Sequence, residues 1–531
     1  MADVDDERGT SIAAPARRRP ARLALVRPNV VIFPQSLSWY GPVPPIGIAY
    51  VASVVRSAGH VVDVIDSVGD AIEQQADFET PVGTLRRIGL SNEEILDRIH
   101  PDTSVIGITH MFLHEWPTIR ALAEEARRRF PDAVIVCGGE NATAFWPWMF
   151  EQTDAIDYCV LGEGEATFLE LVNGGTEGGP TAAPEGSAAR AGLGEGGGPA
   201  GTGRSVRPRQ LDAVPRPAWD LFPLDEYWRY ADFYGVHRGR SMLVLATRGC
   251  PYRCSFCSSP QMWTTRYVVR DPDDVADEIA DYVNEFGVKN INFADLTAIT
   301  KRKWTLQFCE ALEKRVSGIT WQLPVGTRAE ALDAEVLQAL WDTGCRNITY
   351  APEAGGERML EVYNKKVKLE HILTSLREAK RIGIVTRVNI IIGHPEERWS
   401  DTWKSLGFLV KAALAGCDDS AVMIFGPYPG SADFKALVDS GRIVVDETFH
   451  YVGLARVSSS AESYNPRMST RQLRIAQFAM LITFYGVGYL RYPKRFLRWI
   501  KGLVGDEETT AVDQLLRVKR NAFRRLEDEA A

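Results

Sequence analysis

Short apolar runs alternate with amphipathic stretches along most of the chain. In the first third, five β-branched runs predict strands, and stretches with apolar residues at every third or fourth position predict helices. The predicted strands are Arg22–Val26, Val61–Asp66, Val105–His110, Ala133–Cys137 and Tyr158–Leu161, and the predicted helices are Gly47–Ser57, Asn92–His100 and Thr118–Phe130. Because helices between strands form βαβ units, residues 21–172 are predicted to fold as a doubly wound parallel sheet.

The second half repeats the alternation with six predicted strands. They are Ser241–Thr247, Asn290–Phe293, Thr320–Leu323, Asn347–Tyr350, Arg387–Ile392 and Val422–Phe425, separated by helical patterns at Pro272–Glu285, Trp304–Arg315, Ala334–Thr343, His371–Arg381 and Thr402–Ala415. We therefore expect residues 217–440 to form a parallel α/β barrel or partial barrel. The functional groups of such barrels lie at the C-terminal ends of the strands.

Three segments depart from this alternation. Residues 1–20 are polar and rich in arginine, and we expect them to be disordered. Residues 173–216 are mostly Gly, Ala, Pro and Glu, which predicts a flexible linker. Residues 441–531 are predicted to be a helical C-terminal tail, and their apolar stretch, Phe478–Leu490, is shorter than the roughly 20 residues that span a bilayer.

The end of that tail allows two interpretations. The apolar stretch is followed by aromatic residues interleaved with basic ones, from Arg491 to Lys501, as in helices that lie at a membrane interface. We favour the alternative, a helix that caps the barrel and turns a basic face to the solvent. Peripheral membrane contact therefore stays open but is not the favoured interpretation.

Composition narrows the class of protein without defining it. The chain has 531 residues, a net charge of −8 and 45% hydrophobic residues, which is an ordinary globular mixture. Its mild acidity argues against a protein held by nucleic-acid phosphates. No signal-peptide pattern follows the arginine-rich start, so we expect a cytoplasmic protein.

Three of the eight cysteines fall within eight consecutive residues, directly after the first strand of the second half. Cys250, Cys254 and Cys257 follow one another at spacings of four and three. A structural zinc site would need a fourth ligand at a recognisable spacing. An iron–sulfur cluster held by three thiolates would instead leave one iron open to a ligand. The other five cysteines are scattered singly, and we expect them to be core thiols.

The pattern Cys-x3-Cys-x2-Cys after the first strand of a barrel, with Phe256 just before the third cysteine, resembles the radical S-adenosylmethionine enzymes. The resemblance implies that Cys250, Cys254 and Cys257 hold a [4Fe-4S] cluster whose open iron binds S-adenosylmethionine. One electron then cleaves the sulfonium and releases a 5′-deoxyadenosyl radical. Zinc or free thiols are the alternatives.

Other barrel residues match this family one at a time. Glu353 and Gly355, in Tyr350–Gly356, resemble its Glu-Ser-Gly segment, although Ala354 replaces the serine. The resemblance implies S-adenosylmethionine contacts for a set of residues at the strand ends: Phe256, Asp295, Arg328, Glu353 and Gly355. For the carboxylates, the alternative is an ordinary capping or salt-bridging role.

The first unit resembles the Rossmann-like cobalamin-binding domain that precedes many radical S-adenosylmethionine barrels. The likeness rests on Pro44–Tyr50, Ala58–His60 and Val64–Asp66, and on the glycine-rich turns after the later strands. The cobalamin contacts that it implies are Thr109, His110, Gly138, Gly139, Glu140, Gly162 and Glu163. The family's Asp-x-His-x-x-Gly signature is absent, so the cobalt would have water, another side chain or no lower ligand.

Together, the two resemblances imply an enzyme that methylates an unactivated carbon or a phosphorus of a biosynthetic intermediate. They imply three cofactors: a [4Fe-4S] cluster, S-adenosylmethionine and cobalamin. The expected partners are a small-molecule or lipid substrate and an external flavodoxin- or ferredoxin-like reductant, with no nucleic acid. The alternatives are a cobalamin-dependent radical cyclase or rearrangement enzyme without methyl transfer, and a cobalamin-binding regulatory protein.

Overall fold

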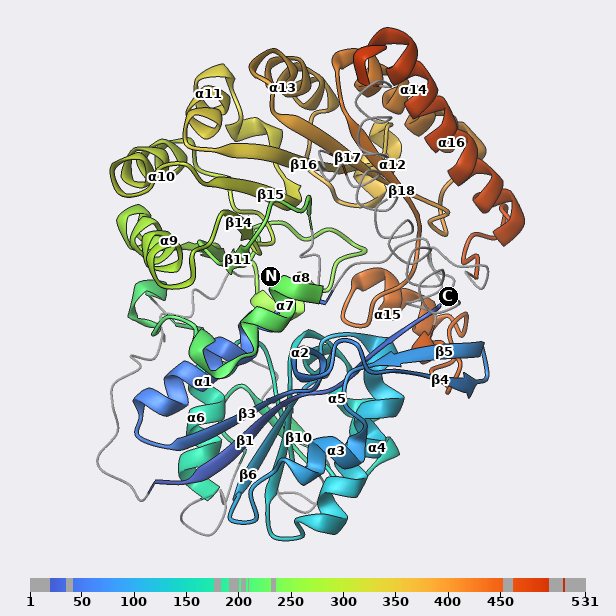
Figure 1. The fold of residues 1–531 in the computed structure, drawn as a ribbon. Helices are drawn as coiled ribbons and strands as arrows, with labels where there is room; N and C mark the ends of the chain where they lie inside the picture. Colours follow the sequence, from blue (N-terminus) through green and yellow to red (C-terminus); the bar gives the residue numbers. More distant parts are fainter. Residues whose placement is uncertain are drawn as a thin grey trace, which may run out of the picture.

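The structure, a computed structural model, describes residues 20–34, 42–175, 183–190, 200–201, 207–208, 210–230, 235–451, 462–495 and 510. It contains a lower α/β unit and an upper barrel-like unit (Figure 1). The predictions for residues 1–19 and for the basic residues between Arg495 and Lys501 lie outside the described part of the chain.

The N-terminal unit is a doubly wound sheet, as predicted. Its strand order is β10-β9-β8-β7-β6-β1-β3, and the five predicted strands pair in parallel. The strands are β1 (Arg22–Arg27), β3 (Val61–Asp66), β6 (Val105–Thr109), β7 (Val134–Gly138), β8 (Tyr158–Val160), β9 (Ser187–Ala189) and β10 (Ala200–Gly201). The helices are α1 (Ile46–Ser57), α2 (Ser67–Asp70), α3 (Asn92–Asp97), α4 (Trp116–Arg129), α5 (Glu140–Gln152) and α6 (Gly164–Gly175), with the 3-10 turn η1 (Leu113–Glu115).

Part of the predicted linker is structured. β9 pairs antiparallel with β8, and β10 pairs with β9, so the chain extends the sheet before it enters the barrel. A 3-10 turn, η2 (Leu211–Ala213), also lies in this stretch. The sequence pattern did not predict β9, because its side chains are small. Ala188 and Ala189 are fully buried on opposite faces of the sheet, but they do not form a long apolar run.

A small second sheet was not predicted. It has the order β2-β5-β4, with β2 (Val30–Ile32), β4 (Gln75–Thr80) and β5 (Gly83–Ile88) all antiparallel. Most residues of β4 are exposed, so this hairpin carries almost no apolar signal. In Figure 1 its hairpin lies at the edge of the N-terminal unit next to α15 (Ala432–Asp439), and Val31 and Leu85 pack with Tyr451 of the C-terminal part.

The C-terminal unit is an open barrel of six parallel strands in sequence order, as predicted. Its strands are β11 (Ser241–Val244), β14 (Asn290–Phe293), β15 (Thr320–Thr327), β16 (Cys345–Glu353), β17 (Val385–Ile392) and β18 (Asp419–Ile424). The outer helices are α9 (Pro272–Phe286), α10 (Arg302–Arg315), α11 (Ala334–Asp342), α12 (Glu357–Val362), α13 (Leu369–Ile382) and α14 (Trp399–Ala415), with the 3-10 turn η4 (Ala329–Ala331). Because β11 and β18 are not paired with each other, the barrel is partial.

Local sequence signals fix where the helices begin and end. Ser91 and Glu94 form the predicted capping box of α3. α9 begins with the N-cap Asp271 followed by a proline, and ends at Gly287, whose left-handed φ of 64° suits glycine. These caps make the boundaries of the predicted helices accurate to within a few residues.

Aromatic residues join the two units. In η3 (Trp219–Leu221), the buried Trp219 indole donates to the Tyr282 hydroxyl of α9 at 2.9 Å. The next helix, α7 (Leu224–Tyr230), places the Tyr227 hydroxyl 2.7 Å from Asp66 at the end of β3. The segment that enters the barrel is therefore also packed on the N-terminal sheet.

The remaining elements lie next to the strand ends and along the open edge of the barrel. They are β12 (Thr247–Arg248), α8 (Ser259–Trp263), β13 (Val268–Val269), α15 (Ala432–Asp439) and α16 (Thr470–Arg491). α16 packs against α14 and β18. It is the one helix of the described chain that is long and apolar enough to cross a membrane by length and composition alone, and 28% of its apolar window is buried.

Candidate active site between two domains

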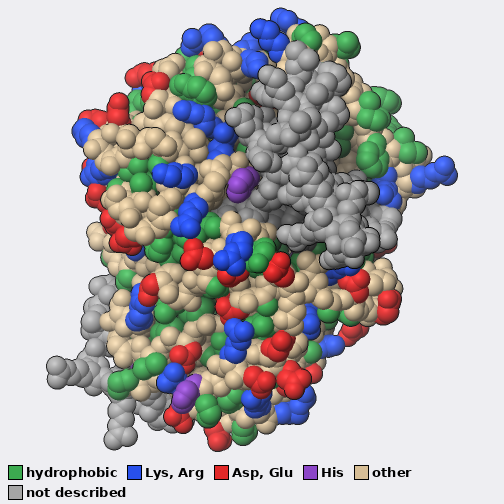
Figure 2. Space-filling model, in the orientation of Figure 1, with side chains coloured by type: hydrophobic (Ala, Val, Ile, Leu, Met, Phe, Trp, Pro, Cys, Tyr) green, Lys and Arg blue, Asp and Glu red, His purple; other side chains and the backbone are tan. Residues whose placement is uncertain are grey.

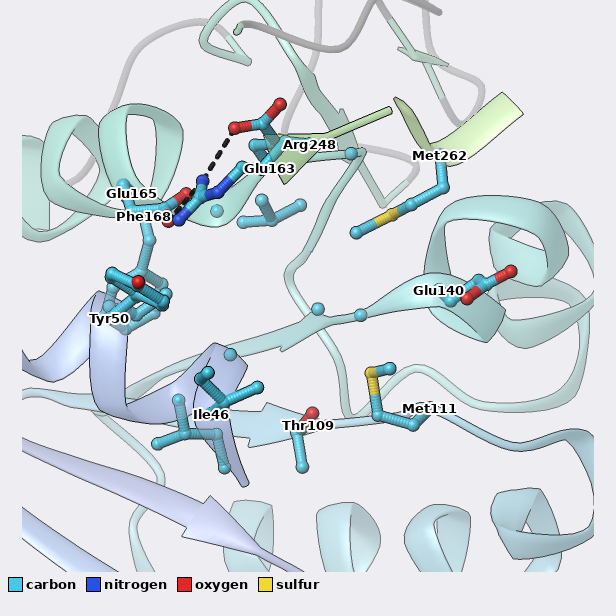
Figure 3. Close-up of a pocket in the computed structure, with 18 of the residues that line it drawn as sticks. Ile46, Tyr50, Thr109, Met111, Glu140, Glu163, Glu165, Phe168, Arg248 and Met262 are labelled. Carbon is cyan, nitrogen blue, oxygen red and sulfur yellow. Dashed lines mark hydrogen bonds and ion pairs between the residues drawn. The ribbon is translucent and has the colours of Figure 1, made fainter. Parts of the chain in front are cut away.

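A cavity of about 300 Å³ lies where the carboxyl ends of the N-terminal strands face the barrel. Its floor comes from β6, β7 and α1, and its roof from β12 and α8 of the barrel (Figure 3). Both a doubly wound sheet and a parallel barrel bind ligands at the carboxyl ends of their strands. The cavity is therefore placed where each unit presents its ligand-binding edge.

Most of the predicted cobalamin contacts line this cavity. Those found in its wall are Thr109, Gly138, Gly139, Glu140, Gly162 and Glu163. Gly139 has a φ of 114°, and a Cβ there would lie 2.8 Å from the carbonyl oxygen of His110. This turn needs glycine, because a larger residue would be both strained and in steric conflict.

His110 is the exception, because it does not line this cavity. Side chains alternate along a strand, so Thr109 and Met111 face the cavity while His110 points to the other side. Its fully buried ring stacks on Trp116 and contacts the Asn141 amide at 2.9 Å. Among the described residues, the cavity wall contains no histidine.

A buried ion cluster closes one side of the cavity. Arg248, which comes two residues before the first cysteine, contacts Glu163 and Glu165 of the N-terminal unit at 2.7 Å each (Figure 3). Arg207 contacts the second oxygen of Glu163 and the carbonyl oxygen of Arg266. Burial opposes the charge of Arg248, but the neighbouring Glu165 and Glu163 carboxylates outweigh it and raise its pKa. The cluster ties the two units together directly beside the cysteine loop.

A second contact between the units lies on the other side of the loop. Glu140, at the first position of α5, accepts a hydrogen bond of 2.5 Å from Ser258, the residue after the third cysteine. Burial raises the pKa of the Glu140 carboxyl, and the Ser258 hydroxyl partly offsets this effect. Thr143 contacts the sulfur of Met262 at 3.4 Å across the same boundary. Helix α8 therefore positions the cysteine loop relative to the N-terminal sheet.

The three clustered cysteines differ from the other five. Cys250, Cys254 and Cys257 are partly exposed, whereas the remaining cysteines are buried, as predicted. Within the described residues, no three Cys, His, Asp or Glu side chains converge on a single metal ion. The assignment of these cysteines to an iron–sulfur cluster therefore rests on their spacing and on their position directly after the first barrel strands.

Hydrogen bonds from elsewhere in the barrel hold the cysteine loop. The Ser255 hydroxyl contacts Asp433 of α15 at 3.0 Å, and the same carboxylate oxygen lies 3.2 Å from His394, which follows β17. Phe256 packs edge to face on Tyr363, with 5.3 Å between the ring centroids. The predicted S-adenosylmethionine residue Phe256 thus also fixes the loop against the rest of the barrel.

Charged residues surround Cys254. Burial raises its pKa, and the nearby Lys365 and Arg328 partly offset the shift. Lys365 pairs with Glu353 at 3.2 Å, and Arg328 stacks over the Tyr252 ring with its guanidinium carbon 3.3 Å from the centroid. Two predicted S-adenosylmethionine contacts, Arg328 and Glu353, are therefore close to the cysteine loop.

Glu353 has an unusual backbone conformation. Its φ is 70°, in the left-handed region, and the pairing of β16 with β17 is irregular between Tyr350 and Glu353. A strained non-glycine residue at the end of a barrel strand is typical of a functional position. Gly355, two residues on, is packed so closely that a Cβ would lie 2.5 Å from the Cα of Ser405. Position 355 therefore requires glycine because it packs against α14.

Asp295 buttresses the strand that leads to the cysteines. Its buried carboxylate accepts hydrogen bonds from the Ala246 amide at 3.2 Å and from both the amide and the hydroxyl of Thr247 at 2.5 Å. Burial raises the pKa of the Asp295 carboxyl to about 6, although these hydrogen bonds act to lower it. Its predicted contact with S-adenosylmethionine stays a prediction, beside this observed structural role.

Several residues of the cavity wall were not predicted. They are Tyr50, Met111, Phe168, Arg248 and Met262. Strand alternation could have indicated Met111, because Thr109 is two residues before it. Tyr50 and Phe168 come from α1 and α6 of the N-terminal unit. Arg248 and Met262 reach the cavity only through docking of the two units, which no local pattern encodes.

A doubly wound sheet that faces an open barrel with three clustered cysteines defines the class of cobalamin-binding radical S-adenosylmethionine enzymes. Residues 244–409 match the radical SAM superfamily, and residues 37–172 match the B12 binding domain. The chain therefore belongs to the radical S-adenosylmethionine superfamily and carries a B12-binding domain ahead of the radical domain. Its cofactors are S-adenosylmethionine, a [4Fe-4S] cluster and cobalamin.

Known proteins resemble both units together. The chain is 25% identical over 479 residues to an uncharacterized methyltransferase of Pyrococcus horikoshii, with 90% of this chain and 94% of the relative covered. It is 27% identical to an anaerobic magnesium-protoporphyrin IX monomethyl ester cyclase of Rubrivivax gelatinosus, with 77% and 69% covered. The radical S-adenosylmethionine methyltransferase TsrM of Kitasatospora setae, solved with cobalamin and a [4Fe-4S] cluster, shares the fold, with a TM-score of 0.63, 16% identity and coverage of 87% and 91%.

The residues present suit these cofactors. Glycines at the ends of β7 and β8 and apolar side chains such as Ile46 and Phe168 form cavity walls that a large ring can approach closely. Gly249, in the cavity wall, is directly followed by Cys250, so the cysteine loop borders the same space. The geometry brings the predicted binding surfaces for cobalamin and for the cluster next to each other.

Proposed function

We propose that the protein is a cobalamin-dependent radical S-adenosylmethionine methyltransferase that methylates an unactivated carbon or a phosphorus of a biosynthetic intermediate. The observation that carries this proposal is the shared cavity, whose wall joins the glycine turns of the B12-binding domain to the strand before Cys250. The methyltransferases among the similar proteins support the reaction class.

In this proposal, Cys250, Cys254 and Cys257 hold the cluster, and Glu353 and Arg328 lie beside bound S-adenosylmethionine. Gly138, Gly139 and Gly162 let the backbone approach the corrin. When bound, the cluster supplies the electron that cleaves S-adenosylmethionine, and cobalamin carries the methyl group. The Arg248 ion cluster and the Glu140–Ser258 contact hold the two binding surfaces in one geometry. Electrons would come from an external flavodoxin- or ferredoxin-like protein.

The radical step is tested by anaerobic iron–sulfur reconstitution followed by incubation with S-adenosylmethionine and a reductant. We expect 5′-deoxyadenosine from the wild type and from Cys309→Ala, whose thiol is buried in the barrel wall, and none from Cys254→Ala. Equal product from both variants would refute the assignment of the clustered cysteines.

The second candidate function is a cyclisation or rearrangement without methyl transfer. The similarity to the cyclase of Rubrivivax gelatinosus supports this candidate. The two reactions differ in their products. With substrate present, S-adenosylhomocysteine formed together with 5′-deoxyadenosine supports methyl transfer. Formation of 5′-deoxyadenosine and a converted substrate without S-adenosylhomocysteine supports the rearrangement.

A further inference from the structure

Helix α16 is fixed to the barrel by one face. Its buried residues are Leu473, Gln477, Met480, Phe484 and Gly488, which follow a helical spacing. Gln477 donates to the Val422 carbonyl oxygen of β18 at 2.7 Å, and Tyr485 contacts Asp419 at the start of the same strand at 2.5 Å. The helix is therefore a cap on the barrel, as the sequence interpretation favoured.

The opposite face of α16 is not the basic surface that this interpretation expected. Ile475, Phe478, Ile482 and Leu490 are 60%, 46%, 71% and 86% exposed, and we call them the α16 stripe. They make up four of the eleven large hydrophobic side chains exposed among the described residues, so exposed apolar surface is concentrated on this helix. A helix that only caps a core would turn polar side chains outwards.

The charged side chains on α16 itself and just after it all have one sign. Arg471 and Arg474 lie in its first turns, Arg491 and Lys494 lie at its end, and no Asp or Glu occurs between Thr470 and Arg491. Figure 2 shows hydrophobic side chains at the edge of the molecule where α16 lies, with basic side chains next to them. An apolar face framed by cations complements a surface that is apolar inside and anionic outside.

We propose that the α16 stripe docks the protein on an anionic lipid bilayer, with the helix parallel to the membrane plane. The helix cannot cross the bilayer in this fold, because its other face is packed on the barrel. Pairing with a second copy of the chain is disfavoured, since antiparallel stripes would bring the cations at opposite helix ends together. An anionic bilayer satisfies both the apolar residues and the basic ends.

The test is co-flotation of the full chain with vesicles of phosphatidylcholine alone or of equal parts phosphatidylcholine and phosphatidylglycerol. We expect the wild type to float with the anionic vesicles, and less at high salt because the attraction of the basic ends is screened. Ile482→Glu should lower the bound fraction about tenfold or more, since an apolar side chain that would enter the bilayer becomes a negative charge. The matched control is Val444→Glu, because Val444 is as exposed as Ile482, at 71%, but lies outside the α16 stripe. This variant should bind as the wild type does.

Three results would overturn the proposal. The first is a wild type that does not float with anionic vesicles. The second is equal binding of Ile482→Glu and Val444→Glu when circular dichroism shows both folded. The third is a wild-type dimer in sedimentation that Ile482→Glu converts to monomer, which would make the stripe a self-association surface. None of these readouts depends on turnover, so they are independent of the proposed reaction.

Discussion

Burial keeps the imidazole of His110 neutral, because its ring lies in the core between Trp116 and Asn141. This burial lowers its pKa to about 3. A base whose folded pKa is depressed stabilises the fold fully above its unfolded pKa of about 6.5, and this contribution is lost as the pH falls towards the folded value. The N-terminal sheet should therefore weaken in mild acid, with His110 as one cause.

The substitution His110→Gln keeps an acceptor for Asn141 and removes the titrating group. Between pH 7 and pH 5, we expect the wild type to lose about 2 kcal/mol more unfolding free energy than the variant. Denaturation midpoints followed at both pH values measure this difference. Identical losses in the two proteins would show that His110 does not titrate in the buried state that the structure describes.

Arg248 is the residue whose removal should matter most at the domain boundary. Arg248→Met leaves the buried Glu163 and Glu165 without this cation, which we expect to cost about 3–5 kcal/mol of stability and to weaken cobalamin binding. Arg302→Met, which removes an exposed cation paired with Asp333, is the control and should change little. Thermal unfolding and cobalamin retention on a desalting column measure both effects, and equal behaviour of the two variants would contradict this role.

At the scale of single elements, the turn between β7 and α5 depends on Gly139. We expect Gly139→Ala to destabilise the N-terminal unit by about 1–3 kcal/mol, because φ is positive and the new Cβ would meet the His110 carbonyl oxygen. Gly407→Ala, in the middle of α14 with open space around it, should instead stabilise the barrel by about 0.5–1 kcal/mol. Melting of the two variants against the wild type checks both signs. A stabilised Gly139→Ala would show that the turn is not constrained.

Elements with strong local patterns were predictable from the sequence, and elements held by distant partners were not. The six barrel strands and α9 carry their own apolar periodicity and caps, so their positions agree with the structure. β9 is made of small residues, and β4 is mostly exposed, so neither has a local signal. These strands exist because a neighbouring strand offers backbone partners.

The same distinction applies to the site. The cysteine spacing and the glycine turns are local, and they were readable in the sequence. The Arg248–Glu163 contact joins residues 85 positions apart in different units, and it follows only from how the units dock. His110 is a third case, because a local rule was available but was not applied. Since Thr109 faces the cavity, strand alternation places the His110 side chain on the opposite face of the sheet.

At the scale of the whole molecule, docking of the two units makes the site. The cavity takes walls from both units, and the contacts of Glu163 and Glu140 with the barrel lie on two sides of the cysteine loop. The N-terminal unit supplies the larger part of the wall, and the barrel supplies the rest. We therefore predict that cobalamin and the cluster are close neighbours in the loaded protein.

The most direct measurement is electron paramagnetic resonance of the full chain loaded with cob(II)alamin and the reduced [4Fe-4S] cluster. We predict a spectrum changed by magnetic coupling between the two centres, which should disappear when either cofactor is omitted. A spectrum equal to the sum of the two separate centres, at full occupancy of both, would contradict a shared site between the domains.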